Sequence, residues 1–120
     1  MTHQINVLRQ ARHDYEDLRA FVINNYPEKS WQECQDQLKS LISYLTVHPN
    51  GGAIPLEIVT LNLPRYRQIA SGKLRIIYEV RQKQIFIHII LGHRRDLNSL
   101  LFRRLLPDHK INPVKQNPAI

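Results

Sequence analysis

The spacing of apolar residues changes once along this chain, from a helical period to an alternating one near residue 53. Before that point, apolar side chains recur every three or four residues in two runs, which is typical of amphipathic helices. The runs are Ala11, Tyr15, Leu18 and Val22, and then Trp31, Cys34, Leu38, Leu41, Ile42 and Leu45. Pro27 separates the two runs, and the segment from His48 to Gly52 ends the second. The pattern predicts a helical hairpin over residues 11–47.

Alternation and short apolar runs dominate the rest of the chain. A brief strand is expected at residues 4–9, and further strands at residues 57–61, 65–70, 74–81 and 85–91. Asp96 is a suitable N-cap for a final helix that ends near Leu105. This order of elements predicts an α+β fold, with the hairpin packed on one face of an antiparallel sheet of about four strands.

The length of 120 residues fits one compact core and excludes a two-domain enzyme. We expect a single domain over residues 1–106 and a flexible tail over residues 107–120. No membrane span or signal peptide is visible, so we expect a cytoplasmic protein with no membrane partner. The six histidines and one cysteine show no zinc-ligand spacing, and we expect neither a metal ion nor a cofactor.

The net charge of +7 is unevenly distributed along the chain. Residues 1–60 carry five basic and seven acidic side chains, for a net charge of −2, whereas residues 61–120 carry twelve basic and three acidic ones, for +9. A basic half on a small domain is typical of contact with polyphosphate or with an acidic protein. The alternative is a solvated face that only keeps the protein soluble.

Several of these basic residues are expected to converge. Arg65 and Arg67 lie two residues apart on one predicted strand, and a turn at Ser71-Gly72 brings Arg75 back beside them. Planar guanidinium groups bind phosphate through paired hydrogen bonds, so the pattern indicates a phosphate-binding surface. The next predicted strand, residues 85–91, is soon followed by His93, Arg94 and Arg95, although Arg95 could instead form an ion pair with Asp96.

These segments resemble the RelE/ParE superfamily of bacterial toxin–antitoxin toxins. The residues that carry the resemblance are Arg65-Tyr66-Arg67, the segment from Ser71 to Val80 and the segment from Ile89 to Leu97. The superfamily pattern has a basic strand, then "G-x-x-R-[VI]-[IL]-Y", and a last strand that ends in "G-H-R-R-[DE]". The match covers residues 5–105 and implies a toxin whose partner is an acidic antitoxin.

Two branches of the superfamily remain open. RelE-like toxins cut mRNA on the ribosome without a metal ion, by attack of the RNA's own 2′-hydroxyl on the adjacent phosphate. ParE-like toxins inhibit DNA gyrase and are not nucleases. The last motifs resemble RelE, whereas the long predicted hairpin is similar to ParE. A nontoxic module that binds RNA or protein is a third possibility. We expect a RelE-like endoribonuclease, with the ribosome and mRNA as its targets.

The RelE pattern places basic positions at Arg65 and Arg67, an arginine at Arg75 and another at Arg94. With His93, whose imidazole titrates near neutral pH, Arg75 and Arg94 are the predicted catalytic residues. The predicted RNA- or phosphate-binding residues are Arg65, Arg67, Lys73 and Arg95. Asn98 stands where the pattern has a tyrosine, which removes a base-stacking and proton-transfer group from the arrangement.

Two further titratable residues in the predicted strands have structural interpretations. Glu79 shares a strand face with Arg75, and we interpret it as the ion partner of that arginine. His88 lies inside an apolar strand, which indicates a hydrogen-bonded core residue.

Overall fold

The computed structural model of the chain describes residues 2–54, 56–60, 65–72, 74–92, 104 and 116–118. It has three helices and five strands in these ranges. They are β1 (Gln4–Leu8), α1 (Arg9–Asn25), α2 (Lys29–Val47), α3 (Leu56–Thr60), β2 (Tyr66–Ser71), β3 (Leu74–Arg81), β4 (Gln84–Leu91) and β5 (Gln116–Pro118). No helix in the described part of the chain is both long and apolar enough to cross a membrane.

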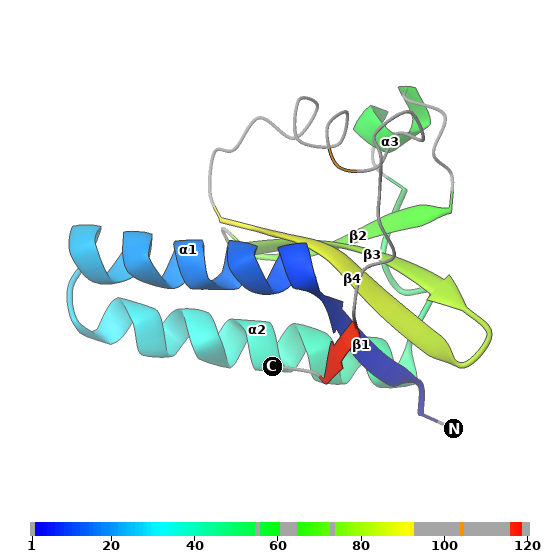
Figure 1. The fold of residues 1–120 in the computed structure, drawn as a ribbon, viewed down its shortest axis with the longest axis horizontal. Helices are drawn as coiled ribbons and strands as arrows, with labels where there is room; N and C mark the ends of the chain where they lie inside the picture. The colour runs from blue at the N-terminus through cyan, green and yellow to red at the C-terminus, as the bar shows by residue number, and fades with distance from the viewer. Residues whose placement is uncertain are drawn as a thin grey trace.

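The strands form one sheet in the order β2-β3-β4-β1-β5, and α1 and α2 lie side by side against one face of it (Figure 1). The predicted α+β fold and the helical hairpin are therefore confirmed. The antiparallel arrangement is confirmed for β2, β3 and β4, whereas β1 joins the sheet parallel to β4. Parallel strands need a long connection between them. Here the helical hairpin, α1 and α2, is part of the connection between β1 and β4.

The core fills the space between the hairpin and the sheet. Val7 of β1, Leu45 of α2 and Tyr78 of β3 are fully buried there. On β3 the even-numbered side chains from Leu74 to Val80 pack against the hairpin, as the alternating pattern predicts. Tyr78 keeps its hydroxyl satisfied because it accepts a hydrogen bond from the Gly52 amide at 2.9 Å.

The predicted strand at residues 57–61 is wrong, because residues 56–60 form the short helix α3. The run Leu56-Glu57-Ile58-Val59-Thr60 has strand-like composition, but the nearest sheet edge is already used: Ala53 pairs with Gln68 of β2 through two backbone hydrogen bonds of 2.7 and 2.9 Å. The helix α3 lies on the side of the sheet away from the hairpin (Figure 1), and Ile58 anchors it as a fully buried side chain.

The predicted final helix, residues 96–105, lies outside the described residues except for Arg104, and the predicted domain end at residue 106 also lies outside them. The domain boundary therefore stays a prediction. Within the predicted tail, Gln116–Pro118 pairs antiparallel with β1.

An irregularity interrupts the ladder between β3 and β4. Ile77 pairs with Ile89, but the next residue, Tyr78, pairs with Ile87, so His88 is an extra residue opposite that step. Such a β-bulge bends its strand and redirects the side chain of the extra residue. As a result, Ile85, Ile87 and Ile90 all reach the core on the hairpin side.

We expect Gly52→Ala to lower the free energy of unfolding by about 1–3 kcal/mol, as overpacking does. A Cβ atom at Gly52 would overlap the Gln68 carbonyl oxygen and lie 2.7 Å from the Tyr78 hydroxyl, and both belong to rigid, paired strands. Gly51→Ala is the matched control: its Cβ would meet only the ring of Tyr44, an exposed side chain that is able to move. Equal losses for the two variants in urea titrations would contradict the prediction.

Candidate functional site

The face of the sheet away from α1 and α2, which we call the outer face, carries a group of charged side chains. Residues directly opposite each other on neighbouring strands share a face. Glu79 lies opposite Tyr66 on one side and Phe86 on the other, and all three belong to the outer face. Tyr78 and its partner Arg67 belong to the hairpin face.

Five residues make up what we call the outer-face cluster: Arg65, Tyr66, Glu79, Arg81 and His88. Glu79 is its centre, with a side chain only 4% exposed. Arg81 donates to both Glu79 carboxylate oxygens, from Nε at 2.8 Å and from Nη2 at 3.3 Å. His88 Nε2 lies 3.0 Å from Oε1 of the same carboxylate, and Arg65 Nε lies 3.8 Å from Oε2.

Aromatic rings fix the orientation of the cationic groups. The Arg65 guanidinium lies over the Tyr66 ring at 4.8 Å, and that of Arg81 lies over the Phe86 ring at 5.2 Å. The Tyr66 and His88 rings meet edge to face, with centroids 4.9 Å apart. Each cation is therefore held by a ring and by a carboxylate, and the arginines remain open to solvent, with side chains 56% and 64% exposed.

The charge state of Glu79 follows from these contacts. Burial alone would raise the pKa of this carboxyl, but the hydrogen bonds from His88 and Arg81, together with their charges, outweigh burial and lower the pKa to about 2. The same contact with Glu79 raises the pKa of Arg81. The cluster therefore contains a buried, ionised carboxylate at neutral pH.

A second ion pair holds the bulge of β4 from the hairpin side. The Asp14 carboxylate on α1 accepts the Ile90 amide at 3.1 Å, and Arg104 binds both of its oxygens at 2.9 and 3.1 Å. Arg104 also donates to the His88 carbonyl at 2.8 Å. These contacts, which we call the Asp14–Arg104 clamp, satisfy two backbone groups at and just after the irregular step, the His88 carbonyl and the Ile90 amide.

Among the predicted arginines that the structure describes, Arg67 lies on a different face of the sheet from Arg65 and Arg75. Arg67 is on the hairpin face, where its Nη1 donates to the Gly52 carbonyl at 2.9 Å. Arg75 is on the outer face and donates to the Gln68 side-chain carbonyl, from Nε at 2.9 Å. The prediction of one convergent surface is therefore wrong for Arg67, because the register of β2 turns it toward the hairpin, whereas Arg65 and Arg75 share the outer face. Arg65 precedes β2, and its guanidinium reaches the Tyr66 hydroxyl at 3.3 Å.

The remaining predicted site residues, Lys73, His93, Arg94 and Arg95, lie outside the described residues, and so does Asn98. Their roles stay predictions. In the part of the chain that the structure does describe, no three His, Cys, Asp or Glu side chains gather closely enough to hold a metal ion.

Sequence reasoning missed two members of the outer-face cluster. The prediction of a hydrogen-bonded core residue at His88 is confirmed for the hydrogen bond, which joins it to Glu79, but its side chain is 17% exposed and belongs to the cluster. Arg81 was not singled out, and Glu79 pairs with Arg81, His88 and Arg65. The spacing of Glu79 and Arg81, two residues apart on one strand, was a usable signal. The contact with His88 was not, because the bulge breaks the alternation that sequence reasoning relies on.

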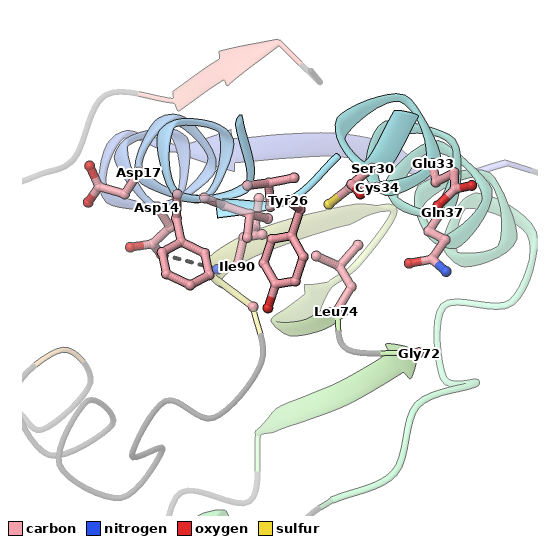
Figure 2. A pocket seen from close by; sticks show the side chains of 14 residues that line it. Asp14, Asp17, Tyr26, Ser30, Glu33, Cys34, Gln37, Gly72, Leu74 and Ile90 are labelled. Atoms are coloured by element: carbon pink, nitrogen blue, oxygen red, sulfur yellow. Dashed lines mark hydrogen bonds between the residues drawn. The ribbon is translucent and has the colours of Figure 1, made fainter. Parts of the chain in front are cut away.

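A groove of about 540 Å³ lies near the turn that joins α1 to α2, between these helices and the adjoining ends of β3 and β4 (Figure 2). Apolar side chains such as Leu74, Ile90 and Tyr26 line it, with Asp17 and Glu33 among its polar lining residues. Cys34 also lines the groove, and burial raises the pKa of its thiol. This keeps the thiol protonated and consistent with a packing role.

Comparison with known proteins adds a family to this geometry. A family model described as the ParE toxin of the type II toxin–antitoxin system, parDE, matches residues 5–97, which include β2, β3, β4 and all of β1 except its first residue. The comparison with curated proteins found no match. The match implies an antitoxin partner, and it spans the hairpin, the sheet and the outer-face cluster. The chain belongs to this family and, with it, to the RelE/ParE superfamily of type II toxin–antitoxin toxins, which contains both the RelE-like and the ParE-like branch.

Proposed function

We propose that this type II toxin inhibits translation by cutting mRNA on the ribosome. The observation that carries the proposal is the convergence of Arg65, Arg81 and His88 on one buried carboxylate of the outer face. Attack by a 2′-hydroxyl requires a proton acceptor and cations that stabilise the charge of the phosphorane. The outer-face cluster supplies a histidine and two exposed guanidinium groups for these purposes. This target would place the toxin's action in the cytoplasm.

The second candidate function is inhibition of DNA gyrase, as in ParE-like toxins. The hairpin favours it, because α1 and α2 are 17 and 19 residues long, and so does the family description. The separation of Arg67 from Arg75 also favours it, because it divides the phosphate surface that the RelE pattern implies. In this case the outer-face cluster would be part of a binding surface.

An acidic antitoxin is the proposed partner. The charge of +9 over residues 61–120 supports a complementary, negatively charged chain. A small antitoxin gene beside the gene of this protein would support the pairing, and co-expression of that antitoxin should restore growth.

The deciding experiment adds the purified protein to ribosomes programmed with a defined message and, in parallel, to a gyrase supercoiling assay. Cut message with unaffected supercoiling is the expected result. Intact message with inhibited supercoiling would assign the protein to the gyrase-inhibiting branch. Intact message with unaffected supercoiling, together with normal growth on expression, would leave only a binding module.

We expect Arg81→Ala to slow cleavage at least tenfold, since a charge-assisted hydrogen bond of about 1.5 kcal/mol corresponds to roughly that factor. Arg19→Ala is the matched control, because it removes an exposed arginine from α1, away from the sheet's outer face. Single-turnover cleavage rates measure both. A rate for Arg81→Ala equal to that of Arg19→Ala would remove Arg81 from the phosphate site.

A further inference from the structure

We infer that His88, oriented by Glu79, is the general base that activates the 2′-hydroxyl in the outer-face cluster. The inference rests on the proposed mRNA cleavage and deepens it by naming the group that moves the proton. The sequence predicts this chemistry at His93, because a histidine titrates near neutral pH. The geometry points instead to a histidine five residues earlier in the chain, on the same sheet face as Arg65 and Arg81.

The contact with Glu79 determines which nitrogen of His88 is available. An ionised carboxylate only accepts hydrogen bonds, so His88 Nε2 must carry the hydrogen that bridges the 3.0 Å to Glu79 Oε1. In the neutral imidazole the lone pair is then on Nδ1. Among the described residues, none forms a hydrogen bond with Nδ1 of His88. Nδ1 is also not one of the fully buried polar atoms that lack a hydrogen-bond partner. Nδ1 is therefore the nitrogen that remains for a substrate proton.

The surroundings of the imidazole suit a base that becomes charged during the reaction. Glu79 of β3 faces it directly, and the Tyr66 ring of β2 packs against its edge. Arg81 and Arg65 contact the same carboxylate. On the backbone side, Arg104 binds the His88 carbonyl and pairs with Asp14. An imidazolium formed at Nδ1 would be stabilised by Glu79, in the way that a carboxylate stabilises the histidine of a catalytic triad.

The bulge places the imidazole where regular pairing would not. In an uninterrupted strand, the side chains of Ile87 and Ile89 would both point to the face opposite that of His88, so Ile89 and His88 could not share the outer face. The extra residue lets Ile89 pair with Ile77 while His88 still reaches Glu79. Bulges of this kind often redirect a side chain next to an active site. The Asp14–Arg104 clamp holds the backbone of this step in place.

The proposed step forms one bond to phosphorus, breaks another and moves one proton. The 2′-oxygen forms a bond to phosphorus, and its proton moves to His88 Nδ1. The bond between phosphorus and the 5′-oxygen of the next nucleotide breaks, and that oxygen takes a proton from water. The products are a 2′,3′-cyclic phosphate and a 5′-hydroxyl, and His88 returns its proton to solvent. Glu79 is a positioning residue, because it acts through His88 and does not touch the RNA.

The test is a pH–rate profile on programmed ribosomes for the wild type and for the His88→Gln, His93→Gln and His13→Gln variants. Glutamine keeps an N–H donor for Glu79 but does not titrate. We expect His88→Gln to lower kcat about a hundredfold, with little change in KM, and to abolish the acid limb of the profile. His13 is exposed on α1, and its substitution should change neither quantity. A His88→Gln profile that keeps the wild-type rate and acid limb would overturn the inference. Loss of that rate and acid limb in His93→Gln would then assign the role of base to His93.

The Glu79→Gln variant tests the positioning role. Without the carboxylate, the imidazolium formed in the reaction loses its stabilising partner, so kcat should fall with little change in KM. An independent measurement is the ¹⁵N spectrum of histidine-labelled wild-type protein, which should show the Nε2–H tautomer for His88. The Nδ1–H tautomer would refute the assignment without any cleavage assay. Wild-type protein that leaves message intact would instead refute the proposed function, and the inference with it.

Discussion

Asp14→Ala should lower the free energy of unfolding by about 3 kcal/mol, at the lower end of the cost of breaking a buried ion pair. Asp14 and Arg104 have side chains only 15% and 14% exposed. Removing the carboxylate leaves the guanidinium without its ion partner in a largely dehydrated position and takes the acceptor from the Ile90 amide. Chemical denaturation followed by circular dichroism measures the loss.

A double-mutant cycle isolates the Asp14–Arg104 clamp. Arg104→Ala alone should also destabilise the protein, and the double variant should cost less than the sum of the two single variants, because the two residues interact directly. Asp17→Ala is the matched control, since it removes an exposed carboxylate from the same helix. Additive effects of Asp14→Ala and Arg104→Ala would show that the ion pair contributes nothing to stability.

Acidification should destabilise the protein through Glu79. The pKa of this carboxyl is lowered from 4.5 to about 2 on folding, so the folded state favours the ionised form. A lowered pKa stabilises the folded state above pH 4.5, and that stability is lost as the pH falls toward 2. At about 1.4 kcal/mol for each pH unit of difference, Glu79 contributes about 3 kcal/mol at neutral pH.

Denaturant titrations at a series of pH values between 7 and 2 measure this contribution. Glu79→Gln should be less stable at neutral pH, and its stability should fall less steeply below pH 5. Glu33→Gln, which removes an exposed carboxylate of α2, serves as the control. If the wild type and Glu79→Gln lose stability in parallel, the carboxylate is not held in its ionised form by His88 and Arg81.

The sequence predicted those parts of the fold in which one periodicity continues over several turns or residues. The hairpin and the meander of β2, β3 and β4 both follow from such patterns. The short helix α3 was missed because its five residues are too few to show a period, and their β-branched composition favours a strand. What decides its structure is the occupied edge at Gln68, a tertiary contact.

The candidate site was predicted less well, for two physical reasons. Period two correctly places Arg65 and Arg67 on one side of an ideal strand, but periodicity does not say which face of the sheet that side is. Pairing with Tyr78 settles it for Arg67, which turns to the hairpin. The second reason is the bulge at His88, which depends on the register between two strands and leaves no trace in the spacing of either one.

The parallel pairing of β1 with β4 has a consequence for how the protein is made. Gln4 pairs with Gln84, so two strands in register are separated by 80 residues of chain. At about 5–20 residues per second, the ribosome takes on the order of 4–16 s to synthesise that interval. Throughout it Val7, which is fully buried in the finished protein, has no sheet to join. The nascent toxin therefore spends most of its synthesis without its folded sheet, because β1 can join the sheet only after β4 has left the ribosome, and β5 pairs with β1 later still.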